Sequence, residues 1–293
     1  MRLPYDECAR SGYGLLRGEA LDLALLLLSK AQHKGEKGIQ GGRRQAYALT
    51  GCITREDGFC RFPAYNGELH MNRLGDRLEA ALMLLQGAKD NTLFADIGSD
   101  HAYLAIEAVK RNIAKSAVAS DINELPLIKG RQNAAFSGID IDFILSDGFK
   151  SLESFPLTSA AICGMGGELI ARIIAESEIA KRIFLILQPM SMQEELRKYL
   201  WDNGFCIERE IFVYESGKAY SIMQVCFDGI KREYSILALY LGMQRESSFE
   251  FSKYCEKILN TATKRRIGIV ARGESTAETD SLIEYCQTQR TSF

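Results

Sequence analysis

The sequence predicts an α/β fold in which a parallel sheet, covered by helices, ends in an antiparallel β-hairpin and is followed by a helical hairpin. Three observations support this prediction. Short apolar runs alternate with helical stretches between residues 92 and 202. Two longer runs with strand-like alternation follow at 205–214 and 219–227. Residues 229–293 then show the apolar spacing that is typical of helices.

The composition is that of an ordinary globular protein. The chain has 293 residues, 46% of them hydrophobic and 25% charged, and its net charge is −2. The chain as a whole therefore gives no sign of a general electrostatic affinity for nucleic acid. No run approaches the roughly 18 apolar residues that a membrane-spanning helix needs, so we expect no membrane segment.

The eight cysteines are scattered and form no Cys-x-x-Cys pair. The sequence therefore shows no zinc or redox motif, and this cysteine usage favours a reducing, cytoplasmic location. Cys52, Cys60 and His70 match no common spacing of metal ligands, so we expect no metal.

Residues 1–70 differ from the rest of the chain. The stretch 34–44 has neither apolar content nor periodicity, and it predicts a loop or a disordered segment. A second possible start, Met71, is followed by an amphipathic helix. We expect an N-terminal extension at 1–70, which is an appended segment or reflects a wrongly assigned start, then a sheet domain at 71–228 and a helical attachment at 229–293.

The alternating region predicts five strands with helices between them. Strand candidates lie at 92–97, 116–121, 141–146, 159–163 and 183–187. Helical stretches lie at about 101–111, 124–136, 167–177 and 191–202. The strands are short apolar runs without alternation, as expected for a parallel sheet covered on both faces. Five such units ending in a β-hairpin form the strand inventory of a Rossmann-like class I methyltransferase, whereas a dehydrogenase closes with further βα units.

The loop after the first strand carries two carboxylates, Asp96 and Asp100, and a single glycine, Gly98. A dinucleotide pyrophosphate would be repelled there, which disfavours an NAD-dependent dehydrogenase. A ligand with ammonium and sulfonium groups would gain roughly 1–4 kcal/mol per close charge pair. S-adenosylmethionine is such a ligand, and its carboxylate suits the free N–H groups of the following helix. Asp100 could instead be only a helix N-cap, and His101 could cap, pack or contact the ligand.

Acidic residues also follow the next two strands. Asp121 ends the second strand, where a carboxylate accepts hydrogen bonds from the ribose hydroxyls of an adenosine. Asp147-Gly148 follows the third strand, where a carboxylate can accept from the adenine amino group. The alternative for Asp147 is a plain Asp-Gly turn.

The fourth strand leads into Gly164-Met165-Gly166-Gly167, at the place where methyltransferases hold the acceptor base. Three glycines leave the backbone bare, so that a flat base can lie against it; the alternative is a glycine turn with no ligand. The fifth strand ends in Gln188-Pro189-Met190, and Gln188 could donate or accept at the edge of the same pocket.

The tail carries the most basic stretch of the chain. Residues 253–272 hold six basic side chains, three of them the run Lys264-Arg265-Arg266, against a single acid, Glu256. Such a stretch can bind phosphate even in an acidic protein, and the alternative is a solvated helix face. Apolar residues from Phe251 to Ala262 predict one helix face, Gly273 ends that helix or turns the chain, and a second helix follows.

These motifs, in this order, resemble the bacterial tRNA adenine N1-methyltransferase family that modifies adenine 22 in the D-arm region. The matching signatures are Asp96-Ile-Gly-Ser-Asp-His-Ala-Tyr-Leu104, Ser120-Asp-Ile-Asn123, Ser146-Asp-Gly148, Gly164-Met-Gly-Gly167, Leu187-Gln-Pro-Met190 and Glu215-Ser-Gly-Lys-Ala-Tyr220. Arg77-Leu78, in the helix before the first strand, looks like the start of the family's domain. The resemblance covers residues 71–227 in detail and 228–293 in outline.

The resemblance implies a Rossmann-like methyltransferase domain at 71–228, S-adenosylmethionine as cofactor, and a coiled-coil-like helical tail that helps to hold tRNA. It implies no protein partner, membrane or metal. The cofactor-binding residues are then Asp96, Gly98, Asp100, His101, Asp121, Asn123, Asp147 and Gly148. The catalytic segment comprises Gly164, Met165, Gly166, Gly167, Gln188 and Pro189. The residues assigned to tRNA binding are Arg77, Lys264, Arg265 and Arg266.

The chain departs from the family pattern in three places. Leu125 stands where the family usually has glycine, the segment before Asp147 lacks the usual arginine, and the extension 1–70 has no counterpart. Two other functions stay open at this stage. One is a methyltransferase of the same fold that acts on a small molecule or a protein, and the other is a non-catalytic RNA-binding relative that keeps the cofactor site.

The chemistry of the implied reaction suits the residues. Adenine N1 carries an in-plane lone pair, so it needs no general base, and the sequence shows no Ser-His-Asp or Cys-His constellation. We therefore expect catalysis by proximity, orientation and exclusion of water. The target base must leave its stack, at a cost of a few kcal/mol.

Overall fold

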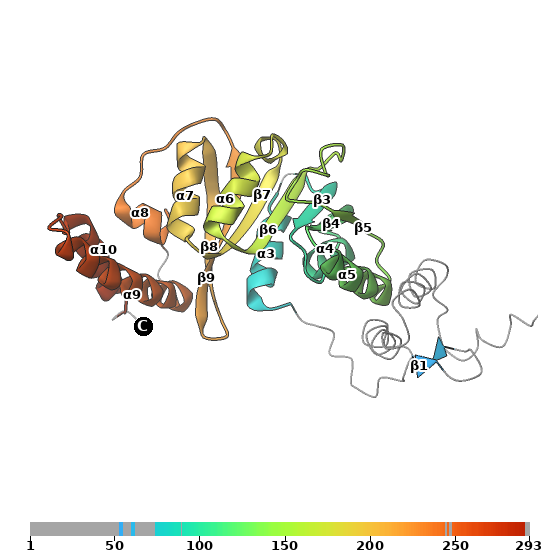
Figure 1. Cartoon of the computed structure of the whole chain (residues 1–293), viewed down its shortest axis with the longest axis horizontal. Coiled ribbons are helices and arrows are strands. Elements are labelled where there is room, and N and C mark those ends of the chain that lie inside the picture. The colour runs from blue at the N-terminus through green and yellow to red at the C-terminus, as the bar shows by residue number, and fades with distance from the viewer. Residues whose placement is uncertain are drawn as a thin grey trace, which may run out of the picture. The chain divides into compact units, whose positions relative to one another are not determined.

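The computed structural model describes residues 53–54, 60–61, 74–88, 90–243, 245 and 248–290 (Figure 1). The chain divides into two compact units, Met1–Asn72 and Arg73–Phe293. In the first unit, the described residues form two short strands, β1 (Ile53–Thr54) and β2 (Cys60–Arg61), which pair antiparallel. The loop expected at 34–44, together with Cys52 and His70, lies outside the described residues.

The second unit is built on a seven-stranded sheet with the order β5-β4-β3-β6-β7-β9-β8. The five parallel strands are β3 (Leu93–Ile97), β4 (Ser116–Asp121), β5 (Asp142–Leu145), β6 (Ser159–Gly166) and β7 (Phe184–Ser191). The antiparallel hairpin is β8 (Phe205–Glu215) and β9 (Lys218–Phe227). The predicted fold class is therefore confirmed, with each strand close to its expected place.

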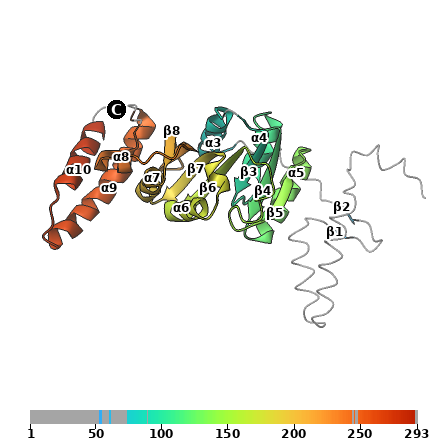
Figure 2. The ribbon, with the colours of Figure 1, turned by 90° about the horizontal axis from the view of Figure 1, so that it is seen from above.

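Helices cover both faces of this sheet (Figures 1 and 2). One face carries α3 (Asp76–Gln86), α4 (Tyr103–Lys110) and α5 (Glu124–Ser137), which bury Leu82, Ile106 and Ala134 among others. The other carries α6 (Gly167–Ala175), the short η1 (Ile179–Lys181) and α7 (Gln193–Asp202), whose buried side chains include Ile170 and Leu196. Burial on both faces explains why the central strands are apolar throughout.

The C-terminal part contains three helices: α8 (Ile236–Leu241), α9 (Phe249–Ala271) and α10 (Ala277–Arg290). The expected helical hairpin is α9 with α10, and Gly273 between them has a φ of +69°. The helix α8 is not among the elements expected from the sequence; it is six residues long and capped by Ser235. So short a helix offers no periodicity to recognise.

The helical attachment shares a core with the sheet. The ring of Phe212 on β8 lies 5.0 Å from the ring of Phe251 and 4.7 Å from that of Tyr254, both on α9. Ala219 of β9 and Tyr240 of α8 belong to the same buried cluster. The tail is therefore packed onto the hairpin edge of the sheet, so truncating it would uncover an apolar surface. None of the described helices is long and apolar enough to cross a membrane.

Candidate active site

The loop after β3 is tied to the end of β4 by two backbone hydrogen bonds. The N–H groups of Gly98 and Ser99 donate to the carbonyl of Ser120 at 2.8 and 2.9 Å. Gly98 has a φ of +73°, and a Cβ placed on it would stand 1.9 Å from the terminal methyl of Met165. The positive φ favours glycine at this turn, and the Met165 methyl packs against the space that a side chain at 98 would fill. The pairing of β3 with β6 places the predicted acceptor segment, Gly164–Gly167, beside the predicted cofactor loop.

Asp96 is the buried acid of this loop. Its Oδ2 accepts a 2.7 Å hydrogen bond from the hydroxyl of Ser99, and its carboxylate accepts from the backbone N–H of Ala105 at the start of α4. Burial raises the pKa of Asp96 to about 6, against the lowering effect of these hydrogen bonds, and the nearby Asp121 adds to the rise. A cationic group placed beside Asp96 would favour its ionised form.

Asp100 and His101 lie at the exposed rim of the same loop. The N-cap of α4 is Ala102, with a φ of +56°, so Asp100 does not cap the helix and that alternative is wrong. The Asp100 side chain is 69% exposed and lies 3.1 Å from Nε2 of His101. The His101 ring stacks on Tyr103 with 5.2 Å between centroids. Both side chains therefore lie at the protein surface.

Asp121 and Asp147 stand at the ends of the two neighbouring strands. Oδ1 of Asp121 accepts a 2.7 Å hydrogen bond from the N–H of Asn123, and Asn123 itself is the N-cap of α5 without a side-chain cap bond. The N–H of Ser146 donates to the Asp121 carbonyl at 2.9 Å, which holds the two strand ends together.

The Asp147-Gly148 pair does form a turn, with Gly148 at a φ of +60°. The carboxylate of Asp147 is exposed and lies 2.6 Å from Nζ of Lys150. This hydrogen bond lowers the pKa of Asp147. The turn is thus part of the structure, and it leaves a charged carboxylate at the strand end.

The acceptor segment is more strand-like than expected. The sequence predicts that the fourth strand ends at 163, but β6 continues to Gly166, with register shifts around Met165 where it pairs with β7. Gly164 has a φ of +81°, whereas Gly166 has an ordinary extended backbone. Gly167 opens α6, and a Cβ there would stand 2.1 Å from the carbonyl oxygen of Met192. The positive φ at 164 and the close approach of Met192 at 167 therefore each favour glycine, whether or not a base lies on this segment.

Gln188 is fully buried instead of lining an open pocket edge. Its Oε1 accepts from Nη1 of Arg77 at 2.6 Å and from the N–H of Gly164 at 3.1 Å. Its Nε2 donates to the carbonyl of Pro189 at 3.0 Å. Both ends of the Gln188 amide are therefore hydrogen-bonded, and the side chain holds Gly164, the first residue of the acceptor segment, in place.

Arg77 reaches this group from α3. Besides Gln188, its guanidinium lies 3.6 Å from the carboxylate of Glu215 and 5.7 Å from the ring centroid of Tyr220. Glu215 and Tyr220 enter the sequence prediction only as members of a signature, without a role of their own. They hold Arg77, and they come from the two sides of the β8–β9 turn, so pattern alone could not connect them with α3.

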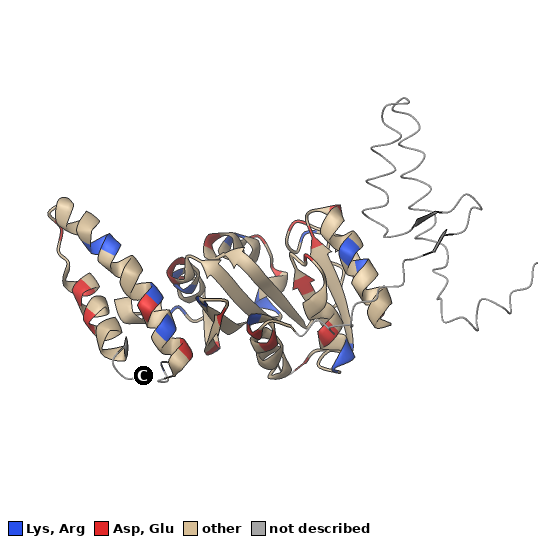
Figure 3. Cartoon of the chain, turned by 90° about the horizontal axis from the view of Figure 1, so that it is seen from below, with Lys and Arg blue, Asp and Glu red and all other residues tan. Residues whose placement is uncertain are grey.

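The basic tail residues are not part of this group. Lys264, Arg265 and Arg266 lie on α9, beside the β8–β9 end of the sheet, while β3, β4 and β5 form the other end. Figure 3 shows basic and acidic patches interleaved along α9. Arg265 donates to the hydroxyl of Tyr240, and Arg266 pairs with Asp280 on α10. Lys264 is exposed and has no partner among the residues that the structure describes.

The described residues include no group of three His, Cys, Asp or Glu side chains that could hold a metal ion. The arrangement instead offers carboxylates at three adjacent strand ends and a bare backbone next to them. Carboxylates can receive an ammonium group and the hydroxyl and amino donors of a nucleoside. The bare segment can receive a flat group next to such a ligand.

Comparisons with known proteins match this chain to methyltransferases. A "tRNA (adenine(22)-N(1))-methyltransferase" of Bacillus subtilis is 28% identical over 184 residues, which cover 59% of this chain and 77% of that protein. A "Putative tRNA methyltransferase" of Mycoplasma pneumoniae is 39% identical over 150 residues, covering 50% of this chain and 67% of that protein. The family resemblance inferred from the motifs is thereby confirmed.

A solved structure of Streptococcus pneumoniae, described as "a putative tRNA (m1A22) methyltransferase, in complex with S-adenosyl-L-methionine", superposes with a TM-score of 0.61. It is 29% identical and covers 74% of this chain and all of that one. The methyltransferase domain family matches residues 74–223, from the start of α3 into β9. Because this match spans more than half of the sequence, the chain belongs to the methyltransferase domain family.

Proposed function

We propose that this protein transfers the methyl group of S-adenosylmethionine to N1 of an adenine in tRNA, adenine 22 of the D-arm region. The observation that carries the proposal is the pairing of β3 with β6, with Ile97 opposite Ile162, which sets the acceptor segment next to the cofactor loop. A base lying on that segment would meet a ligand held at the strand ends. The tRNA methyltransferase names of the relatives in Bacillus subtilis and Mycoplasma pneumoniae support the choice of substrate.

The residues at the strand ends suit the cofactor. Asp96 and Asp100 would meet its ammonium group, Asp121 its ribose hydroxyls and Asp147 its adenine amino group. A carboxylate has two oxygens, and Oδ1 of Asp121 accepts from Asn123, so Oδ2 is the oxygen we assign to the ribose. When bound, S-adenosylmethionine supplies an electrophilic methyl group on a cationic sulfur.

The protein's own residues would bind, orient and exclude water. Adenine N1 attacks with its in-plane lone pair, so no side chain has to remove a proton. The positive charge passes from the sulfonium to the methylated base, so a free cation next to N1 would oppose the reaction. The carboxylate of Glu215, 3.6 Å from Arg77, offsets the positive charge of the Arg77 guanidinium. We assign Arg77 to a phosphate or ribose of the flipped nucleotide, and not to the base edge.

The tRNA would also contact the C-terminal helices. Lys264 is the exposed cation best placed to receive a phosphate, and Arg265 and Arg266 follow it on α9. On this proposal the chain has three parts, the extension at 1–70, the methyltransferase domain at 71–228 and the tRNA-binding attachment at 229–293. A tRNA substrate and the cysteine usage support a cytoplasmic location.

The test is incubation of the full chain with methyl-labelled S-adenosylmethionine and unmodified tRNA, followed by nucleoside analysis. Label in 1-methyladenosine is the expected result, and a transcript with adenine 22 replaced by guanine should take up none. Label in another nucleoside, or in protein or small molecules only, would reject the substrate. Cofactor binding without any methyl transfer would identify a non-catalytic relative. Deleting 229–293 is unsuitable as a control, because α9 covers apolar residues of β8 and β9.

A further inference from the structure

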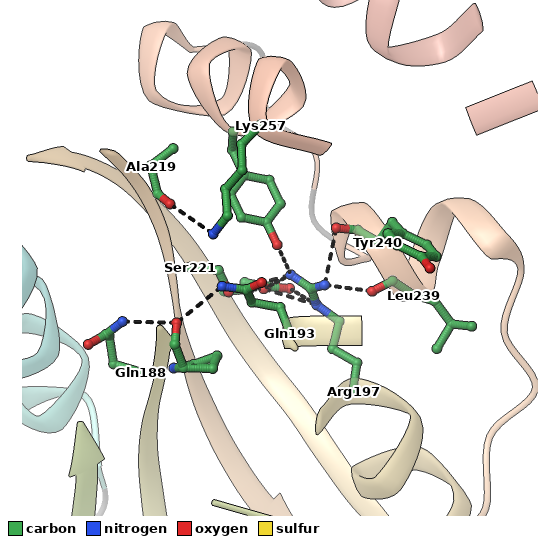
Figure 4. Close-up of polar contacts among 11 residues, drawn as sticks. Gln188, Gln193, Arg197, Ala219, Ser221, Leu239, Tyr240 and Lys257 are labelled. Atoms are coloured by element: carbon green, nitrogen blue, oxygen red, sulfur yellow. Dashed lines mark hydrogen bonds and ion pairs between the residues drawn. The ribbon is translucent and has the colours of Figure 1, made fainter. Parts of the chain in front are cut away.

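The most deeply buried charge in the described part of the chain is Arg197 of α7, whose side chain is 0% exposed. Its guanidinium lies 2.6 Å from Oε1 of Glu210 on β8. It also donates to the hydroxyl of Tyr254 on α9 at 3.1 Å, and to the carbonyls of Leu239 and Tyr240 at 2.6 and 3.2 Å (Figure 4). One side chain thus joins α7 to the hairpin, to α8 and to α9.

These partners are the ones that hold the C-terminal helices. Leu239 and Tyr240 are in the last turn of α8, where carbonyls lack a partner within the helix. The guanidinium of Arg197 donates hydrogen bonds to both of these carbonyls. Tyr254 lies in the second turn of α9, and burial raises its pKa to about 12, so its hydroxyl stays protonated. Arg197 therefore ties α8 and α9 to α7 and the hairpin, in addition to the apolar contacts between these helices and the sheet.

One turn earlier, the same helix contacts Pro189 of β7, which pairs with Met165 of the acceptor segment. Nε2 of Gln193, the first residue of α7, donates to the carbonyl of Pro189 at 3.2 Å, the same oxygen that accepts from Gln188 (Figure 4). Gln193 and Arg197 are four residues apart, so they share one face of α7 and stand about 6 Å apart along its axis. One turn of α7 therefore connects Gln193, which binds Pro189, to Arg197, which binds the C-terminal helices.

The chain of interactions continues to the basic stretch. Tyr240, whose carbonyl Arg197 holds, accepts at its hydroxyl from Arg265 of α9. The nitrogen of Lys257, also on α9, donates to the carbonyl of Ala219 on β9 at 3.2 Å. Two basic side chains of α9, Lys257 and Arg265, thus take part in the interactions that bind α9 to β9 and to α8.

We propose that Arg197 is a positioning residue that sets where tRNA held on α9 presents its target adenine to Gly164–Gly167. This inference rests on the proposed function. Arg197 touches neither the predicted cofactor site nor the acceptor glycines, and it acts through α7 on one side and through α8 and α9 on the other. Its loss should change the fit between docking surface and acceptor segment without changing the cofactor site.

The test must avoid leaving a buried charge alone, because that would destabilise the fold strongly. Arg197→Met and Glu210→Met are therefore combined, which removes both charges and keeps the volume. Tyr254→Phe is the milder variant, since it removes one hydroxyl and keeps the ring. Lys198→Met is the matched control: Lys198 is the next residue of α7, is exposed, and contacts Asp202 and Tyr234 at the surface.

The expected result is a fall of about 10-fold or more in kcat/KM for tRNA in the double variant, since small misplacements of reacting groups are costly. Tyr254→Phe should show a smaller fall and Lys198→Met none. The affinity for S-adenosylmethionine should stay within about twofold in all of them. Wild-type tRNA kinetics in the double variant, or a matching loss of cofactor affinity, would overturn the inference.

A mutant cycle between Arg197 and the basic stretch separates a positioning role of Arg197 from a merely structural one. If Arg197 acts by placing α9, its change should add little in a Lys264→Ala/Arg265→Ala/Arg266→Ala background, because that variant no longer holds tRNA on α9. Fully additive losses would overturn the inference.

Hydrogen exchange gives a readout that needs no tRNA: the amides of α8 and α9 should lose protection in the double variant while those of α4 and α5 keep it. Failure of wild type to methylate tRNA would reject the proposed function, and unchanged protection would reject the positioning role.

Discussion

Arg77 donates a 2.6 Å hydrogen bond to the side-chain oxygen of Gln188, a residue that lies 111 positions later in the chain. The same oxygen accepts from the N–H of Gly164. The amide of Gln188 therefore joins the helix before the sheet to the first glycine of the acceptor segment. Because its nitrogen is engaged with Pro189, the amide can adopt only one orientation. The acceptor segment is held in place before any ligand arrives.

Gln188→Leu should lower kcat for tRNA by about 10- to 100-fold, because Gly164 and Arg77 both lose the partner that places them. The affinity for S-adenosylmethionine should change by less than about twofold. Steady-state kinetics and calorimetry check the two halves of this prediction. Gln86→Leu, at the exposed last residue of α3, is the matched control. An unchanged kcat would show that the hydrogen bonds of Gln188 are not needed to place the acceptor segment.

Gly166→Val should abolish turnover and leave cofactor binding largely intact. Gly166 has an extended backbone that valine adopts readily, and the nearest atom to a new Cβ would be Oγ of Ser191 at 3.4 Å. The fold should therefore tolerate the change, while the added methyl groups cover the surface on which the base would lie. Methyl transfer and cofactor affinity are measured on the same preparation.

Gly167→Ala is the informative comparison, because its Cβ would collide with the backbone of Met192. That variant should lose thermal stability, whereas Gly166→Val should not. If Gly166→Val loses cofactor binding together with turnover, the segment is structural and the acceptor assignment is wrong.

The sequence predicted the order of strands and helices because each is a local pattern. It placed the end of the fourth strand too early, since glycines at 164 and 166 indicate a loop although β6 keeps its pairing with β7. Likewise, a polar residue at a strand end suggests a ligand contact, and nothing local reveals that Gln188 is buried. Its partner Arg77 comes from a distant helix, so only the folded chain shows the pair.

The basic stretch shows the same limit. A charge run can be counted from sequence, but the partners of Arg265 and Arg266 are Tyr240 and Asp280, which lie on α8 and α10. Asp100 is the opposite case, because a residue type that commonly caps helices turned out not to cap one. The motifs sufficed for the family, since they recur in a fixed order along the sheet, whereas the interactions that support them depend on packing.

Asp121→Ala should weaken S-adenosylmethionine binding by about 1–3 kcal/mol, the range for hydrogen bonds to a charged acceptor. Asp121→Asn is the control for the local turn, because an amide oxygen can still accept from the N–H of Asn123. We expect Asn to preserve stability and to recover only part of the affinity. Calorimetry with unchanged affinity in both variants would remove Asp121 from the cofactor site.

Cofactor binding should depend on pH through Asp96. Burial raises its pKa to about 6, so below that value the free protein carries a neutral carboxyl there. The ammonium group of the ligand favours the ionised form, so binding at low pH must release a proton. The affinity should fall by up to about tenfold per pH unit below 6 and level off above 7. Calorimetry at about pH 5.5, just below this pKa, in two buffers measures the released proton, and Asp96→Asn should bind more weakly with no such dependence. A flat profile in wild type would contradict the assignment.

The basic stretch should act on tRNA by neutralising phosphates. Replacing Lys264, Arg265 and Arg266 by alanine should raise KM for tRNA and flatten its salt dependence, by about 0.9 in the logarithmic slope for each phosphate no longer neutralised. Lys264 is expected to account for most of the effect, since Arg265 and Arg266 must leave Tyr240 and Asp280 to reach a phosphate. Lys181→Ala is the control, because Lys181 lies on η1, outside the basic stretch, and pairs with Glu178 at the surface. Cofactor affinity should not move, since β3, β4 and β5 are at the other end of the sheet. A triple variant with wild-type KM and salt slope would show that this stretch is only a solvated helix face.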